Sequence, residues 1–129
     1  MILVDADFFI GIYLEKDAHH ISCIEISQKI AEQLITTHDV IDEVITKMSY
    51  FKRIDIASKF YNVIKKQQMS IVYPTPSLDD AATRFLQSQN NSHVSLTDCM
   101  NMVVAREKGI EYILSFDKNY EKNGFKLFK

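Results

Sequence analysis

The sequence predicts a three-layer α/β/α sandwich with a central, mainly parallel sheet. Short apolar runs typical of buried strands alternate with longer segments whose apolar residues recur at helical spacing. Such alternation favours a parallel sheet that is covered by helices on both faces. The 129 residues are 47% hydrophobic and 25% charged, without a repeat or a Pro/Gly-rich linker. We therefore expect a single domain over residues 1–129.

The expected strands are short runs rich in Ile, Leu, Val, Tyr and Phe. They cover residues 2–4, 34–36, 71–73, 112–114 and, with the weakest signal, 125–128. The only prolines, Pro74 and Pro76, follow the third run and mark a turn.

The expected helices cover residues 18–33, 39–52, 55–68, 78–89 and 95–108. The second of them has an apolar stripe that should face the core, with Asp42 and Glu43 along its margins. The stripe consists of Val40, Ile41, Val44, Ile45, Met48 and Phe51. The last helix is apolar over much of its circumference and should be deeply buried, and Gly109 is a suitable C-cap.

Composition excludes several classes of protein. No apolar run approaches the roughly 20 residues that cross a bilayer, and the N-terminus lacks the features of a secretory signal. We therefore expect a cytoplasmic protein that does not enter membranes. Cys23 and Cys99 show no CxxC pairing, so we interpret both as reduced thiols in the core.

The formal net charge of −2 is unevenly distributed along the chain. Acids predominate as far as Glu43, whereas basic residues predominate between Lys47 and Lys66. A second basic group closes the sequence, at Lys118, Lys122, Lys126 and Lys129. Such asymmetry can steer a polyanion toward the protein, although a solvated helix face would explain it equally well.

Four acids are placed where an open α/β sheet binds its ligands, beyond the carboxyl ends of the strands. Asp5 follows the first strand, Glu43 lies in the helix after the second, Asp98 opens the buried helix, and Asp117 follows the run 112–114. Crowded carboxylates repel one another unless a cation lies among them. Oxygen ligands suit Mg²⁺ or Mn²⁺.

Each acid also has a structural interpretation. Ser95-Leu96-Thr97-Asp98 has the pattern of a helix capping box, so Asp98 could simply satisfy backbone donors. Asp117 could be an ordinary turn residue. Asp39 and Asp42 suit the positive end of a helix dipole, and periodicity alone does not distinguish Asp42 from Glu43. Local sequence leaves these alternatives open.

The ordered set of motifs resembles the PIN-domain nucleases, and in particular the VapC-type toxin ribonucleases. The motifs are Ile2-Leu3-Val4-Asp5, the segment from Thr36 to Val44, Ser95 to Cys99, and Ile113 to Tyr120. The resemblance implies a parallel sheet with Mg²⁺ or Mn²⁺ at an acidic cluster, and hydrolysis of RNA phosphodiester bonds by a metal-activated water. It matches Asp5, Glu43 and Asp98 to the core acids of the family and Asp117 to a fourth, more variable acid.

The resemblance favours Glu43 over Asp42 and matches Ser115 to a hydroxyl beside the site. It further implies the toxin of a toxin–antitoxin pair, with an RNA substrate, a possible antitoxin partner and a homodimer. In toxin relatives, the region of the two middle helices serves these protein contacts. Its aromatic residues here are Tyr50, Phe51, Phe60 and Tyr61, for which plain core packing is the competing interpretation.

Asp7 departs from the family pattern, which usually has a neutral residue at this position. Asp5-Ala6-Asp7 also resembles the first motif of haloacid dehalogenase-type phosphatases, with Asp5 as nucleophile and Asp7 as general acid. However, no Gly-Asp-x-x-x-Asp element follows a late strand. A receiver-like signalling domain would need a phosphoacceptor Asp after the third strand, which Tyr73-Pro74 does not provide. A PIN scaffold that only binds partners remains a further alternative.

Overall fold

The computed structural model, which describes residues 1–90 and 93–129, contains one parallel sheet. Its strands are β1 (Ile2–Val4), β2 (Leu34–Thr37), β3 (Ser70–Val72), β4 (Tyr112–Leu114) and β5 (Lys126–Leu127). Their order is β3-β2-β1-β4-β5, and every neighbouring pair is parallel. β1 therefore lies in the centre, with Leu3 opposite Ile35 on one side and Ile113 on the other.

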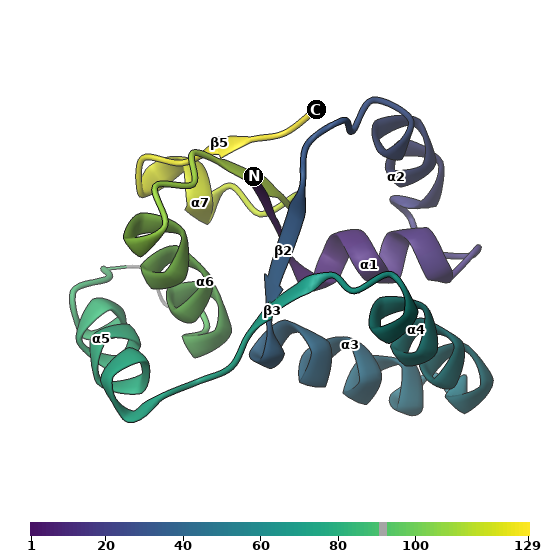
Figure 1. The fold of residues 1–129 in the computed structure, drawn as a ribbon, viewed down its shortest axis with the longest axis horizontal. Coiled ribbons are helices and arrows are strands. Elements are labelled where there is room, and N and C mark those ends of the chain that lie inside the picture. The colour runs from purple at the N-terminus through teal and green to yellow at the C-terminus, as the bar shows by residue number, and fades with distance from the viewer. Residues whose placement is uncertain (91–92) are drawn as a thin grey trace.

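Helices cover both faces of the sheet (Figure 1), which confirms the predicted three-layer sandwich. One face carries α1 (Ala6–Tyr13), α2 (His20–Ser27), α3 (His38–Tyr50) and α4 (Ile54–Lys66). The other face carries α5 (Pro76–Gln87), α6 (Leu96–Glu107) and the short α7 (Asn119–Lys122). Successive side chains of a strand point to opposite faces, so Ile2 and Val4 enter the first core and Leu3 enters the second.

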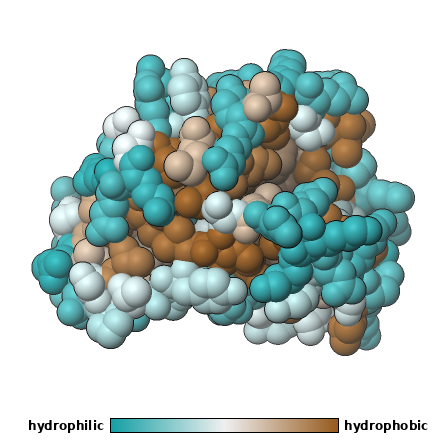
Figure 2. All heavy atoms as spheres, viewed as in Figure 1, coloured by the Kyte–Doolittle hydropathy of each residue, from teal (hydrophilic) through white to brown (hydrophobic). Residues whose placement is uncertain are grey.

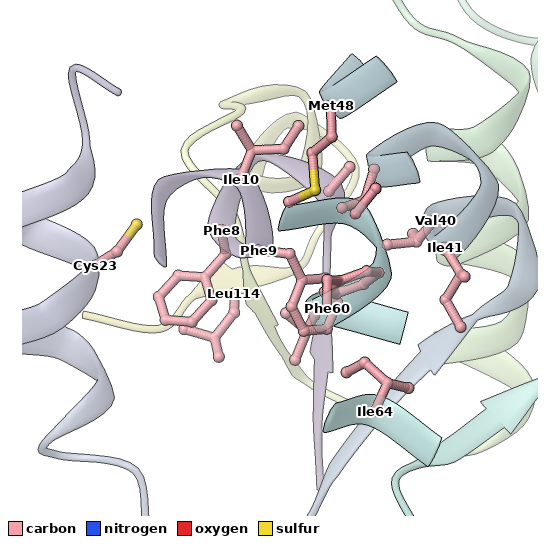
Figure 3. Close-up of a cluster of buried hydrophobic side chains, with 14 of the residues drawn as sticks. Phe8, Phe9, Ile10, Cys23, Val40, Ile41, Met48, Phe60, Ile64 and Leu114 are labelled. Atoms are coloured by element: carbon pink, nitrogen blue, oxygen red, sulfur yellow. The ribbon is translucent and has the colours of Figure 1, made fainter. Parts of the chain in front are cut away.

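The core between the sheet and α1–α4 is built around two aromatic rings. Figure 3 shows Phe9 of α1 against Phe60 of α4, and their ring centroids are 5.1 Å apart in an edge-to-face arrangement. Val40, Ile41, Val44 and Met48 of α3 are also buried there, as the stripe predicted. On the visible face of the molecule, hydrophobic residues concentrate in the middle and hydrophilic residues surround them (Figure 2).

Some expected helices have different bounds, and two helices were not expected. α1 begins directly after β1, and its residues Phe8, Phe9 and Ile10 are all buried, so it shows little of the periodicity that identifies a surface helix. α7 is a single turn. α2 covers residues 20–27 rather than 18–33. The other helices start and end within two residues of the expected bounds, a range in which helix ends fray.

Two apolar residues do not face the core as predicted. α3 ends at Tyr50, so Phe51 lies beyond its last turn and is 61% exposed. Leu96, the first residue of α6, is 45% exposed, while residues 98–105 of this helix are all buried. Gly109 ends α6 with φ +66°, a conformation that favours glycine, and Ile110 N–H donates to the Ala105 carbonyl at 2.8 Å. Gly109 therefore terminates the helix as predicted, one position after the C-cap residue Lys108.

Two predictions about composition can be compared with the structure. Cys23 and Cys99 are both buried free thiols, as expected. In the part of the chain that the structure describes, no helix is both long enough and apolar enough to span a membrane.

Candidate active site

The candidate site lies where the connections leave the central strand in opposite directions. The chain continues from β1 to β2 on one side, whereas β4 pairs with β1 on the other. This is the switch point at which open α/β sheets bind ligands. Asp5 directly follows β1 and Ser115 directly follows β4, and Asp5 N–H donates to the Leu114 carbonyl at 3.0 Å.

Asp5 is the most buried acid of the site, with 5% of its surface exposed. Its Oδ1 accepts hydrogen bonds from Ala6 N–H at 2.8 Å, as the N-cap of α1, and from Asn101 Nδ2 at 3.2 Å. Its Oδ2 lies 3.0 Å from Ser115 Oγ. Burial, followed by the charges of Asp7 and Asp98, raises the pKa of Asp5 to about 8. Neighbouring carboxylates therefore already disturb one another in this fold.

Asp98 uses its two oxygens for different purposes. Oδ2 accepts from Ser95 N–H at 3.1 Å, while Asp98 N–H donates to Ser95 Oγ, so the predicted capping box is present. Oδ1 instead faces the site and lies 3.4 Å from the Tyr120 hydroxyl. Burial raises the pKa of Asp98, and the charges of Asp117 and Glu43 contribute to the increase. The capping role therefore leaves one oxygen of Asp98 directed toward the site.

A buried polar network connects these two acids. Thr37 Oγ1 donates to Asn101 Oδ1 at 2.8 Å, and Asn101 Nδ2 donates to both Asp5 and the Tyr120 hydroxyl oxygen, the latter at 2.9 Å. Thr37, Asn101 and Tyr120 are each 0% exposed. Sequence reasoning gave none of the three residues a role, although Thr37 and Tyr120 lie within the motifs that resemble the PIN-domain nucleases. One signal was available, since Asn101 is an amide between Met100 and Met102 in an otherwise apolar segment.

Asp7, whose membership of the site the sequence left open, lies beside Asp5. Its Oδ2 accepts from Phe116 N–H at 2.8 Å and lies 3.1 Å from Ser115 Oγ, so Ser115 contacts both carboxylates. Its Oδ1 is buried and has no hydrogen-bond partner among the described residues. Burial raises the pKa of Asp7, against the lowering effect of the Phe116 and Ser115 hydrogen bonds. Asp7 and Ser115 thus belong to the same polar cluster as Asp5.

Glu43 and Asp117 lie around this cluster rather than within it. Glu43 forms an ion pair with Lys47 at 3.5 Å, and its charge contributes to the raised pKa of Asp98. Asp42 instead pairs with His38. Glu43, Lys47, Tyr50 and Thr97 line part of a groove of about 400 Å³. Asp117 Oδ1 accepts from Asn119 N–H at 2.9 Å, as expected of a turn residue, and its charge raises the pKa of both Asp7 and Asp98.

The chemistry of the cluster suits a hard divalent cation, although its acids are not arranged as a finished coordination shell. Over residues 1–90 and 93–129, no three His, Cys, Asp or Glu side chains are grouped closely enough to hold a metal ion. However, no described lysine or arginine forms an ion pair with Asp5, Asp7 or Asp98. Asp7 Oδ1 lacks a hydrogen-bond partner among the described residues, and the pKa of Asp5 is raised. Both observations show that nearby groups do not compensate the negative charge of these carboxylates. A shared cation would compensate that charge.

A parallel sheet with buried carboxylates at its switch point defines an α/β protein with an acidic site. A family model identifies the family more closely: the PIN domain model matches residues 2–126, so the chain belongs to the PIN domain family. Membership of the PIN domain family rules out a haloacid dehalogenase-type phosphatase fold and a receiver-like signalling fold for this chain.

A solved structure agrees with the family assignment. The chain is similar to Mycobacterium tuberculosis VapC20, a toxin that cleaves the sarcin–ricin loop. The two chains share 21% sequence identity, the similarity covers 97% of this chain and 96% of VapC20, and the TM-score is 0.90. At this identity the similarity shows a common fold. No curated protein matches the sequence.

Proposed function

We propose that this chain is a divalent-metal-dependent endoribonuclease that hydrolyses RNA phosphodiester bonds, and that it is the toxin of a cytoplasmic toxin–antitoxin pair. The observation that carries the proposal is the buried pair of Asp5 and Asp98, which share a hydrogen-bond network and lack a cationic partner among the described residues. Membership of the PIN domain family and the fold shared with a toxin that cleaves the sarcin–ricin loop support it.

Asp5, Glu43, Asp98 and Asp117 are the proposed ligands of Mg²⁺ or Mn²⁺. Their oxygens are the donors that such ions prefer. When bound, a divalent ion supplies a Lewis acid for the phosphate and lowers the pKa of a coordinated water. Asp5 and Asp98 are the central pair in this proposal, because both are buried, while Glu43 and Asp117 approach from the margins.

The protein contributes a prearranged, water-poor setting for these acids. Asp5 is held by Ala6 N–H and Asn101, and Asp98 is held by Ser95 N–H, so neither carboxylate has to be ordered when substrate arrives. The Asp7 carboxylate accepts from Phe116 N–H and thereby holds the segment that leads to Asp117. Fixed ligands of this kind lower the cost of assembling the site.

RNA is proposed to reach the site along the groove beside Glu43. Lys47 and Tyr50 line this groove, and Tyr50 is 79% exposed. The Lys47 ammonium pairs with Glu43, and would contact a phosphate once Glu43 binds the cation. An exposed tyrosine ring can stack on an unpaired base. Lys118, in the turn after Asp117, is a second candidate for contact with the RNA backbone.

A test uses a single-stranded RNA oligonucleotide and purified protein with Mn²⁺ or with a chelator. We expect internal cleavage with Mn²⁺, none with the chelator, and recovery when excess Mn²⁺ is added back. A partner-binding scaffold predicts a different result, namely a melting temperature that responds to metal or partner without any cleavage. Absence of both cleavage and metal-induced stabilisation would contradict the proposed enzyme.

A protein-contact surface is proposed on α3 and α4. Ile54 and Tyr61 are 65% and 45% exposed and line one groove with Ile45, whereas Phe60 on the same stretch is buried in the core. Exposed aliphatic and aromatic side chains gathered on one surface mark a site of protein association. We assign this α3–α4 surface to a second copy of the chain in a homodimer, and an antitoxin is the further proposed partner.

A further inference from the structure

The hydroxyl group of Tyr120 lies at the centre of the acidic cluster. Tyr120 belongs to the single turn α7, and its side chain is 0% exposed. The hydroxyl oxygen accepts from Asn101 Nδ2 at 2.9 Å and lies 3.4 Å from Asp98 Oδ1. Asn101, which donates to both groups, links the hydroxyl to Asp5, and the hydroxyl lowers the pKa of that carboxyl against the effects of burial and charge. One phenol group therefore acts on both buried acids.

The direction of the phenol proton follows from its neighbours. Asn101 Oδ1 accepts from the Thr37 hydroxyl, so the NH₂ group of the amide is turned toward Tyr120 and Asp5. The NH₂ group supplies donors only, and the Tyr120 oxygen must accept from it. The single proton of the phenol is then available to the carboxylates. Thr37, Asn101 and Tyr120 thus form an ordered series of donors that ends at Asp5 and Asp98.

Packing alone does not account for this hydroxyl. The Tyr120 ring fills the core between the sheet and α6, where a phenylalanine ring would occupy the same space. Burying a hydroxyl costs free energy unless it is hydrogen-bonded, and here every polar neighbour belongs to the acidic cluster or supports it. Ser95 N–H occupies Asp98 Oδ2, and the Tyr120 hydroxyl lies at the other oxygen, Oδ1. The hydroxyl is therefore directed at the acids.

We propose that Tyr120, oriented by Asn101, is a positioning residue that holds the Asp5 and Asp98 carboxylates in place to share one divalent cation. The inference rests on the proposed metal-dependent nuclease function and adds a residue that contacts neither RNA nor the reacting atoms. Mutation of groups that orient metal ligands from behind typically lowers metal affinity by about 10–100-fold. Tyr120 is expected to act through affinity for the cation rather than through affinity for RNA.

Tyr120→Phe tests this inference because it removes a single oxygen atom. Tyr112→Phe is the matched control, since Tyr112 begins β4 at the opposite end from Ser115 and its ring packs on Phe128. Each protein is stripped of metal and titrated with Mn²⁺ while its melting temperature is followed. We expect Mn²⁺ affinity to fall about tenfold in Tyr120→Phe and to stay unchanged in the control. At a fixed, non-saturating Mn²⁺ concentration, kcat should fall while KM for RNA is retained.

A second variant shows whether the two network residues act as one unit. Asn101→Leu keeps a side chain of similar size and removes the group that orients the phenol. In the double variant with Tyr120→Phe, the loss of Mn²⁺ affinity should be no greater than in the more severe single variant. Additive losses would mean that the residues act separately, and would overturn the proposed series.

The outcomes distinguish the inference from the function on which it rests. If wild-type protein binds Mn²⁺ and cleaves RNA, but Tyr120→Phe behaves like Tyr112→Phe in both assays, only the role of Tyr120 is refuted. If the wild type neither binds Mn²⁺ nor cleaves RNA, the proposed function is refuted and the inference falls with it. If Tyr120→Phe lowers the metal-free melting temperature and leaves Mn²⁺ affinity intact, the hydroxyl has only a structural role.

Discussion

Asp98 shows how one carboxylate can satisfy two hypotheses that the sequence set against each other. Its Oδ2 completes the capping box with Ser95, while its Oδ1 faces Tyr120 and the site. Capping fixes the carboxylate at the N-terminus of α6. A side chain that binds a cation also has to be held rigidly. The capping interaction and the proposed metal role are therefore compatible in a single side chain.

Asp98→Asn separates the two roles. The asparagine oxygen can still accept from Ser95 N–H, so the free energy of unfolding should stay within about 1 kcal/mol of the wild-type value. The charge toward the site is lost, and RNA cleavage should fall by about 100-fold or more. Chemical denaturation and RNA cleavage with Mn²⁺ measure the two effects. Asp80→Asn, at an exposed position of α5, should change neither. A variant that unfolds, or one that cleaves normally, would contradict the assignment of Asp98.

Asp5 should make the metal-free protein less stable as pH rises. Its pKa of about 8 in the folded protein exceeds the ordinary 3.8, because of burial and the charges of Asp7 and Asp98. A raised pKa means that the stabilising contribution is complete below about pH 4 and is lost as pH rises toward 8. In chelator, the free energy of unfolding of wild type relative to Asp5→Asn should therefore fall between pH 4 and 8. The limiting slope is about 1.4 kcal/mol per pH unit.

Saturating Mn²⁺ should reduce this dependence, because a bound cation favours the ionised carboxylates. Denaturation curves at several pH values, with chelator or with Mn²⁺, provide the measurement. Parallel pH profiles for wild type and Asp5→Asn in chelator would show that Asp5 ionises normally in the folded protein.

The proposed central acids, and Ser115 beside them, could be selected from the sequence, but the supporting residues Asn101 and Tyr120 could not. Asp5 and Asp98 follow a strand and open a helix, which are recognisable positions in an α/β chain. Asn101 and Tyr120 are recognised only when α6 and α7 are packed together, because their significance depends on contacts across the sequence. Asp7 and Ser115 meet for the same reason, although more than 100 positions separate them.

At the scale of elements, the contact between α1 and α2 depends on a glycine. A Cβ atom added at Gly11 would overlap the Cys23 sulfur, which is buried. Gly11→Ala should lower the free energy of unfolding by about 1–3 kcal/mol, since overpacking outweighs the better helix propensity of alanine. Denaturant unfolding measures this change.

Cys23→Ala supplies the control for that prediction, because it removes the overlapping sulfur. In the Cys23→Ala background, Gly11→Ala should cost little or become stabilising. An equal cost in both backgrounds would show that the α1–α2 contact is not the source of the effect.

The α3–α4 surface predicts association of two chains. Ile54 is 65% exposed and lines the groove of this surface with Tyr61, so Ile54→Glu would place a charge in the proposed interface. Light scattering should find a wild-type dimer and an Ile54→Glu monomer. Ile21→Glu, at a 74% exposed position of α2, should remain dimeric. A wild type that stays monomeric at high protein concentration would contradict the proposed homodimer.

The two helices that bury a single apolar stripe, α3 and α4, could be predicted from the sequence, whereas α1, which has no clear stripe, could not. α3 and α4 bury one stripe each and were located to within about two residues. α1 is buried over most of its surface because it crosses between β1 and the neighbouring helices, so its sequence carries no clear periodicity. The exposure of Phe51 depends on where α3 ends, which the apolar pattern does not specify.

For the whole molecule, the order of the strands assembles the site. β1 lies between β2 and β4, so the residues that follow these three strands meet at one edge of the sheet. The distribution of charge is consistent with this arrangement, because acids surround the site while basic residues predominate from Lys47 to Lys66. A net charge of −2 therefore does not argue against an RNA substrate.

Anomalous scattering from a crystal of the full chain soaked in Mn²⁺ tests directly whether Asp5 and Asp98 share a divalent cation at the carboxyl end of β1. We predict an anomalous peak between these two carboxylates in wild-type crystals and its loss in Asp98→Asn. Absence of a peak there at millimolar Mn²⁺, or a peak held only by other residues, would contradict the claim.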